Sequence, residues 1–247
     1  MTKAKLIFIG VTGYVLFSLI LMPASWLIKM LPMPAELKLG RVSGTVWQGE
    51  VSAVHYDSLA FDRLSWSLNG WALFSGKVQL ALYSGSLQNP ALPYIKGDVS
   101  YGFTGAALND TMLTLPVSQL LPMLSLPMPV DASGTLVLDV SAYQQGQPRC
   151  RALNGSASWQ EARLQTPTGN WLDLQNLFGT LSCDNGTAVL STDGENVLGL
   201  EIKAVANAEQ LLVNGTLKPS ANMPQEVHQA MQFLGKPDAQ GRYPIRF

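Results

Sequence analysis

The sequence predicts a mainly β protein: an N-terminal transmembrane helix, then an antiparallel β-rich meander or groove domain with one or two short helices. Three observations predict this fold class. The run between Lys5 and Lys29 is uncharged and mostly apolar, the later chain alternates between apolar and polar residues, and glycine turns separate the alternating segments. We expect three parts in the 247 residues: a cytoplasmic tail over 1–5, a transmembrane helix over 6–28, and an exported β-rich domain over 29–247.

The transmembrane helix is predicted from the residues between Lys5 and Lys29, 23 positions without a charge. As a helix they would span roughly 34 Å, which exceeds the hydrocarbon thickness of about 30 Å. Trp26 and Lys29 suit the far membrane interface, where an indole and a snorkelling ammonium both find polar partners. A cleaved signal peptide is the alternative, but its apolar region is only about 7–15 residues long. The length favours a retained anchor.

The exported part is predicted to consist of half-buried strands. Leu64, Trp66 and Leu68 fall on one face of DRLSWSLNG, and Leu80 and Leu82 fall on one face of KVQLALYSG. The segments GTLVLDVSA, LEIKAVANA and QLLVNGTLK alternate in the same way. A period of two over so many segments indicates antiparallel strands with one apolar face.

Asn-Gly pairs at 69–70, 154–155, 185–186 and 214–215 predict tight turns between these strands. In GRVSGTVWQGEV, residues 40–51, the glycines predict a bulge or close backbone packing where the first strands begin. Four prolines predict a short helix and a loop over 115–130. A helix is predicted over 223–236, where Val227, Met231 and Leu234 share a face and Gly235 ends the pattern.

The chain has two cysteines, Cys150 and Cys183. A disulfide between them, formed in an oxidising compartment, is the simplest use of such a pair. Two unrelated buried thiols are the alternative. Closing a loop of this length would stabilise the fold by roughly 3–4 kcal/mol on the chain-entropy estimate.

The composition favours neither nucleic acid binding nor catalysis. The net charge is -1, and no Lys/Arg cluster occurs. The segment GWALFSGK, residues 70–77, has one residue too many between its glycines for a phosphate-binding loop. His55 and His228 are the only histidines, and the acidic residues are scattered singly. We therefore expect no enzyme, no metal and no cofactor.

Two uses remain for a membrane-tethered β domain of this kind. One is a scaffold that presents its sheet to other proteins, and the other is a lipid-handling groove whose apolar face stays partly open. The candidate apolar groove consists of Leu64, Trp66, Leu68, Leu80 and Leu82. An exposed strip of these side chains would favour the groove, whereas burial under a second sheet would favour the scaffold.

Four segments together resemble the type II secretion system protein N family, over nearly the whole chain. They are RVSGTVWQGEV, RCRALNGSASWQEA around Cys150, LFGTLSCDNG around Cys183, and the closing LGKPDAQGRYPI. The resemblance implies a single-pass inner-membrane protein whose C-terminal domain, residues 29–247, lies in the periplasm. It also implies an accessory role in type II protein secretion through contacts with other secretion-system components.

The family is also similar in fold to AsmA-like periplasmic β-groove proteins, which are associated with lipid transport. This similarity implies an alternative function, a periplasmic lipid-binding or lipid-shuttling groove. The resemblance supplies no catalytic residues.

Overall fold

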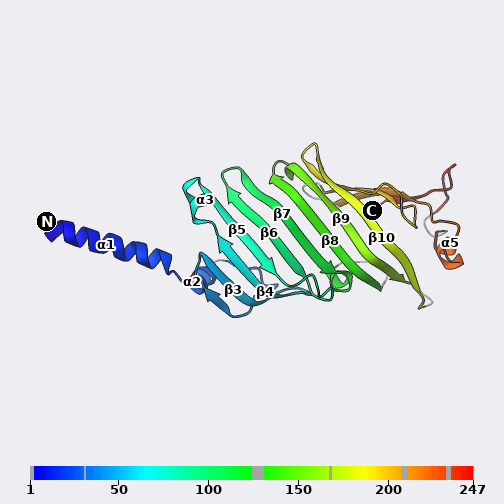
Figure 1. The fold of residues 1–247 in the computed structure, drawn as a ribbon. Helices are drawn as coiled ribbons and strands as arrows, with labels where there is room; N and C mark the ends of the chain where they lie inside the picture. The colour runs from blue at the N-terminus through cyan, green and yellow to red at the C-terminus, as the bar shows by residue number, and fades with distance from the viewer. Residues whose placement is uncertain are drawn as a thin grey trace.

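All described strands belong to one antiparallel sheet of fourteen strands (Figure 1). The structure is a computed structural model, and it describes residues 3–30, 32–123, 131–166, 169–206, 211–231 and 235–246. From β3 to β14 each strand pairs with its neighbours in sequence, and β1 and β2 both pair with β3. The predicted antiparallel meander with a few short helices is confirmed.

The strands are β1 (Leu37–Leu39), β2 (Val42–Gly44), β3 (Gln48–Tyr56), β4 (Leu59–Leu68), β5 (Lys77–Ser84), β6 (Tyr94–Gly102), β7 (Gly105–Pro116), β8 (Ala132–Gln145), β9 (Cys150–Gln165), β10 (Trp171–Asp184), β11 (Thr187–Ser191), β12 (Glu201–Ala206), β13 (Leu211–Leu217) and β14 (Tyr243–Arg246). The helices are α1 (Lys3–Ile20), α2 (Ala24–Met30), α3 (Gly70–Phe74), α4 (Val117–Leu120), the 3-10 turn η1 (Leu121–Met123) and α5 (Gln225–Met231).

The segment expected as one helix over 6–28 forms two helices instead. Helix α1 ends at Ile20 and α2 begins at Ala24, with Pro23 between them. Proline has no amide hydrogen to continue the helix and disfavours helical backbone in the residue before it. Pro23 forms an isolated β-bridge with Thr45. Across the part of the chain that the structure describes, no helix combines the length and the apolarity needed to cross a membrane.

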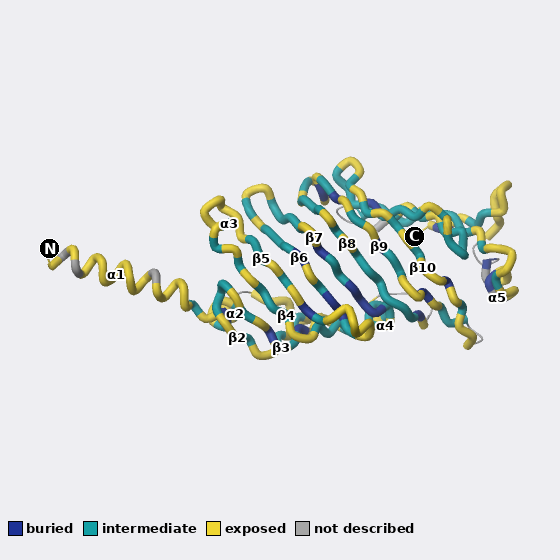
Figure 2. Tube along the Cα trace, viewed as in Figure 1, coloured by how far each residue is buried: buried dark blue, intermediate teal, exposed yellow. Residues whose placement is uncertain are grey.

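The sheet is open and has few fully buried residues (Figure 2). The accessible surface of the whole chain is 16329 Å², whereas a compact monomer of this mass would expose about 10,700 Å² by the usual scaling. Strands β11–β14 turn away from the plane of β5–β9, so the sheet is strongly twisted (Figure 1). The excess surface follows from the single layer, because a lone sheet covers neither of its own faces, and from α1, which extends away from the sheet (Figure 1).

Two of the four predicted Asn-Gly turns lie between strands. Asn185 and Gly186 form the β10–β11 turn, with positive φ angles of 48° and 82°. Asn69 precedes α3, and its side-chain oxygen accepts a hydrogen bond from the Trp71 amide at 3.1 Å. The second glycine of the segment 40–51, Gly44, also has a positive φ, at the end of β2.

The other two Asn-Gly predictions are wrong, because both pairs lie inside strands. Gly155 is in β9, and a Cβ there would collide with the main-chain oxygen of Asp139 in the adjacent strand. Gly215 is in β13, where a Cβ would collide with the main-chain oxygen of Glu201. These glycines therefore serve close strand packing and not turns.

The two predicted helical regions hold short helices. Helix α5 lies within 223–236, directly after Pro224, and it buries Val227 and Met231; Leu234 is outside the described residues. Helix α4 and η1 occupy 117–123 of the predicted 115–130 segment, and residues 124–130 are outside the described ranges.

The predicted disulfide between Cys150 and Cys183 is confirmed, with a Cα–Cα distance of 6.1 Å. It joins the first residue of β9 to the second-last residue of β10. Beside it, the amides of Arg149 and Cys150 both donate to the Gly186 carbonyl, at 2.9 and 3.0 Å. The crosslink therefore fixes the β10–β11 turn against the start of β9.

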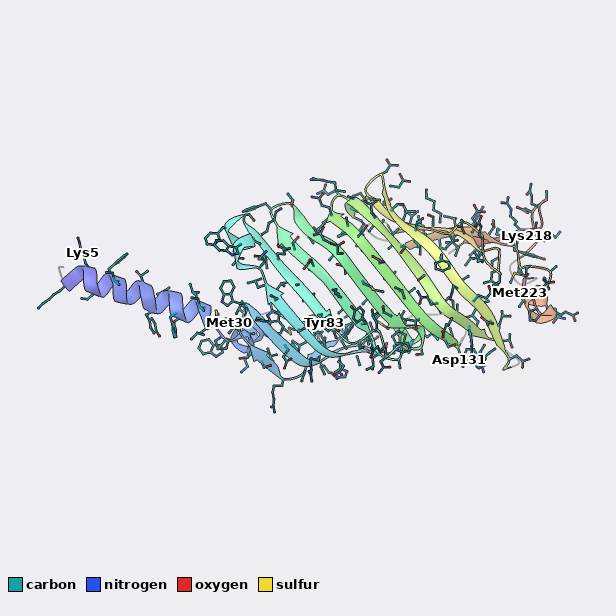
Figure 3. The ribbon with its side chains drawn as sticks, in the orientation of Figure 1. Lys5, Met30, Tyr83, Asp131, Lys218 and Met223 are labelled. Carbon is teal, nitrogen blue, oxygen red and sulfur yellow. A yellow bond between two sulfur atoms is a disulfide. The ribbon has the colours of Figure 1, made fainter. Side chains whose placement is uncertain are left out.

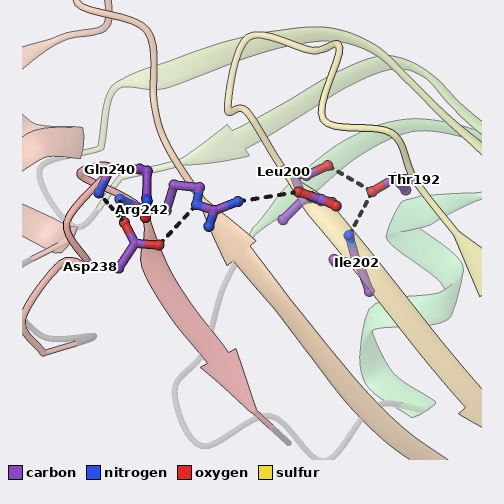
Figure 4. A network of polar contacts seen from close by, with 7 residues as sticks. Thr192, Leu200, Ile202, Asp238, Gln240 and Arg242 are labelled. Carbon is purple, nitrogen blue, oxygen red and sulfur yellow. Dashed lines mark hydrogen bonds and ion pairs between the residues drawn. The ribbon is translucent and has the colours of Figure 1, made fainter.

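The C-terminal edge of the sheet is held by a polar network around Arg242 (Figure 4). The Arg242 Nε donates to Asp238 Oδ2 at 2.9 Å, and its amide donates to Asp238 Oδ1 at 2.8 Å. The amide hydrogen bond above all, with the guanidinium beside it, holds the pKa of Asp238 below its usual range. Arg242 also lies 3.9 Å from Glu201 of β12, so the network ties the segment before β14 to the sheet.

We predict that replacing both cysteines by alanine lowers the free energy of unfolding by roughly 3–4 kcal/mol, because the unfolded chain regains the entropy of the open loop. Urea titration of the purified full-length chain measures this change. Dithiothreitol should shift the midpoint of the unmodified protein and leave the double variant unchanged. Equal midpoints for the oxidised protein and the double variant would contradict the prediction.

Candidate functional site

An apolar cavity of about 570 Å³ lies between α2 and the first strands of the sheet. None of its lining residues carries a charge. The lining comprises Leu19, Met22, Ala24, Leu27, Ile28, Met33, Leu39, Val46, Trp47, Val51, Leu64, Trp66, Leu68, Leu73, Val78, Leu80 and Leu82. A cavity lined in this way can accept an apolar chain and offers nothing to fix a polar group.

The wall formed by α2 is positioned by the joint between the two N-terminal helices. The Val46 amide donates to the Met22 carbonyl at 3.0 Å, and the Trp47 Nε1 donates to the Leu19 carbonyl at 2.9 Å. Leu19 lies in the last turn of α1, and Met22 lies in the link between α1 and α2. The Trp66 Nε1 donates to the Val46 carbonyl at 3.2 Å from the opposite side. The link between α1 and α2 is therefore held by hydrogen bonds to the β2–β3 turn.

All five residues of the candidate apolar groove line this cavity. Leu64, Trp66 and Leu68 come from β4, and Leu80 and Leu82 come from β5. The strand register pairs Trp66 with Leu82 and Leu68 with Leu80, so these side chains share one face of the sheet. Whether this strip is a binding groove stays a prediction.

Sequence reasoning missed the part of the lining that comes from α2. Ala24, Leu27 and Ile28 had been assigned to the transmembrane helix. The signal that could have separated them is Pro23, which interrupts the apolar run before Ala24.

Beyond the cavity, the apolar side of the sheet continues across most of its strands. We call this the apolar face. The register aligns Leu113 of β7 with Leu138 of β8, and Leu181 of β10 with Leu190 of β11. The half-buried members from β5 to β13 include Leu82, Val99, Leu113, Leu138, Trp159, Leu181, Leu190 and Val213.

These side chains are not covered as a sandwich core would be. In a sandwich, a second sheet packs about 10 Å away and buries the inward residues. Here every described strand belongs to the one sheet, and the central members of the apolar face are only half-buried. The apolar face is therefore a long, partly open hydrophobic surface that begins at the cavity.

The opposite face is polar. It carries a second cavity of about 540 Å³, lined among others by Glu50, Lys96, Asp98 and Asp110. Within the described residues, no three His, Cys, Asp or Glu side chains lie close enough together to hold a metal ion. The two faces thus differ in chemistry: one favours apolar chains and the other favours water or polar protein surfaces.

A tyrosine pair lies beside the polar cavity. The rings of Tyr83 and Tyr94 pack edge to face, with centroids 5.8 Å apart. Burial and, to a smaller extent, the neighbouring Tyr83 raise the pKa of Tyr94 above its usual range. Burial thus disfavours the ionised form of Tyr94, as suits a packing residue.

A family model described as type II secretion system (T2SS), protein N, matches residues 35–246. No solved structure matches the chain.

Similar proteins of the same description occur in several bacteria. Type II secretion system protein N of Aeromonas hydrophila is 35% identical over 242 residues, covering 95% of this chain and 93% of its own length. The protein of the same name from Vibrio cholerae is 30% identical over 244 residues, covering 94% and 96%. That of Klebsiella pneumoniae is 28% identical over 245 residues, covering 95% and 90%.

The family match includes every strand of the sheet, both cysteines and the sheet residues of the cavity, and the relatives align over almost their full length. The chain belongs to the type II secretion system protein N family.

Proposed function

We propose that this protein is an accessory inner-membrane component of the type II secretion machinery that acts through protein–protein contacts in the periplasm. The observation that carries the proposal, beside family membership, is the open single-layer sheet. The chain exposes about half again the surface of a compact monomer, and the open sheet offers an extended area to partners. The oxidised cysteine pair supports a periplasmic location.

Helix α1 is proposed as the inner-membrane anchor, with residues 1–5 in the cytoplasm and, because α2 packs on the sheet, the chain from α2 onward on the periplasmic side. The uncharged run between Lys5 and Lys29 supports this assignment. So does the exposure of the described side chains of α1, which include Ile7, Phe8 and Phe17 (Figure 2). Large apolar side chains at such density are stable in lipid and unfavourable in water.

The polar face is the proposed surface for secretion partners. Phe178 of β10 is 62% exposed there, beside strand positions that carry serine and threonine. An aromatic side chain on a polar, exposed surface is typical of a contact residue in a protein interface. Tyr83 is a second exposed aromatic residue on the same face.

A second candidate function, a periplasmic lipid-binding or lipid-shuttling groove of AsmA-like type, is favoured by the apolar face. Its half-buried aliphatic side chains run from the cavity at β4 and β5 to β13. Burying apolar surface contributes about 25 cal/mol per Å². A phospholipid acyl chain laid along this face would therefore be stabilised without a single charged contact.

We predict that a photo-crosslinker in place of Phe178 captures another secretion-system component in cells that express the whole machinery. The expected result is a defined adduct, because the polar face is proposed to contact that component directly. Mass spectrometry of the adduct identifies the partner. The control is the same variant in cells without the other secretion genes, where the adduct should be lost. Persistence of the same adduct in those cells would contradict the proposed contact.

We predict that a photo-crosslinker at Leu138 captures phospholipid if the groove function holds, because Leu138 lies in the middle of the apolar face. Radiolabelled lipid in the adduct is the measurement. Asp139 provides the matched control, since it is the next residue in β8 and points to the opposite, polar face. Equal lipid labelling at both positions, or none at either, would exclude the groove.

A further inference from the structure

We propose that α3 and the β6–β7 turn form a membrane-docking surface whose aromatic rings enter the headgroup region of the bilayer. We call this surface the aromatic rim, and it consists of Trp71, Phe74, Tyr101 and Phe103. The exposed fractions are 83%, 87%, 65% and 97% in that order. The proposal rests on the N-terminal anchor proposed above, which sets the side of the molecule that faces the membrane.

The four residues gather at one corner of the sheet. The ring centroids of Trp71 and Phe74 are 5.9 Å apart on α3. A Cβ built on Gly76, directly after α3, would collide with the Phe103 ring, so the turn residue lies over the end of the helix. Tyr101 pairs in register with Val78 at the start of β5. Residues from two loops that are far apart in sequence thus form one patch.

The short helix α3 is held in a fixed shape. Asn69 caps its first turn, and the Ser75 hydroxyl donates to the Ala72 carbonyl at 2.7 Å at its end. Gly76, with a φ of 71°, then turns the chain into β5. The exposed aromatic rings of this capped helix do not contribute to the packing of the protein's own core. The arrangement suits a surface that is covered by another phase.

The position of the aromatic rim identifies that phase as the bilayer. Gly70 of α3 faces the Trp47 ring, and the Trp47 Nε1 donates to the Leu19 carbonyl near the end of α1. Leu73 of α3 lines the same cavity as Leu19. Figure 1 shows α3 on the side of the sheet from which α1 extends, and Figure 3 shows Lys5 at the free end of α1 and Met30 at its base.

The charges around the aromatic rim complement an anionic membrane. Helix α2 and the segments 69–78 and 101–105 contain Lys29 and Lys77 and no acidic residue. Trp26 and Met30 of α2 are also exposed, 63% and 72%, beside the base of α1. Tryptophan with lysine at the end of an apolar segment is the usual composition of a membrane interface. A surface that binds another protein would have no need to lack carboxylates in this way.

Docking through the aromatic rim would place the first strands against the membrane. The apolar cavity between α2 and β4–β5 shares Leu73 with α3, so it would open close to the bilayer surface. The aromatic rim would therefore fix the orientation of the sheet relative to the membrane. The anchor helix alone would leave the sheet free to rotate about the helix axis.

The test uses the full-length chain reconstituted into vesicles of phosphatidylethanolamine and phosphatidylglycerol. The described cysteines are both in the disulfide, so a single cysteine introduced by Thr104→Cys, next to Phe103, can carry an environment-sensitive nitrobenzoxadiazole label. Phe178→Cys gives the control label on an exposed strand position far from α3. Ile7→Cys reports separately on the anchor.

We expect the label at position 104 to shift its emission to the blue and to be quenched by lipids that carry a nitroxide near the headgroup, with neither effect at position 178. Adding Trp71→Ser, Phe74→Ser and Phe103→Ser should abolish both effects at position 104. These three side chains are exposed, so their loss should leave the unfolding midpoint unchanged.

Three results would overturn the proposal. Equal signals at positions 104 and 178 would show that the rim does not touch lipid. Signals that survive the serine triple variant would show that the rings are not responsible. A blue shift without lipid quenching, lost on dilution into excess vesicles, would assign the rim to a second copy of this chain. Absence of lipid quenching at position 7 would instead reject the anchor, whatever happens at position 104.

Discussion

The structure depends on main-chain hydrogen bonding between neighbouring strands, because all strands among the described residues belong to one sheet and none forms a second layer against it. Each strand from β3 to β13 pairs with the strands before and after it in sequence. The fully buried apolar side chains are few for a chain of this length. A sandwich is held by interdigitating side chains between its two sheets. Here the main-chain hydrogen bonds between strands hold the sheet together, and apolar side-chain pairs across neighbouring strands add further stabilisation.

Two local features follow from this dependence on strand pairing. Glycines such as Gly155 and Gly215 lie where the backbones of neighbouring strands come too close for a side chain, so they preserve the ladder. The Arg242 network acts on the last strands, where the ladders are short, and the disulfide fixes the β10–β11 turn against the start of β9. Strands with few paired residues at the end of a sheet separate most readily. The polar network restrains this end of the sheet, and the disulfide restrains the turn before it.

The single layer also explains why the two faces have different chemistry. Strand alternation sends every second side chain to each side, and no second sheet within the described ranges covers the apolar side. At its N-terminal end this apolar face closes into a cavity because Pro23 breaks the apolar run and turns α2 back onto the sheet. The same joint brings α3 and its exposed aromatic side chains beside the base of α1. The position of the cavity and that of the aromatic rim thus both depend on the short link between α1 and α2.

The sequence by itself determined the strands, the disulfide and the grouping of Leu64, Trp66, Leu68, Leu80 and Leu82, because each depends on local alternation or on a count of two cysteines. It also located the short helices near Pro116 and Pro224. It did not determine that α2 leaves the helical run, or that two Asn-Gly pairs lie inside strands. These depend on contacts with residues distant in sequence, such as Thr45 for Pro23 and Asp139 for Gly155. Only the tertiary structure decided that the apolar face stays open, since alternation specifies that a face is apolar and not what covers it.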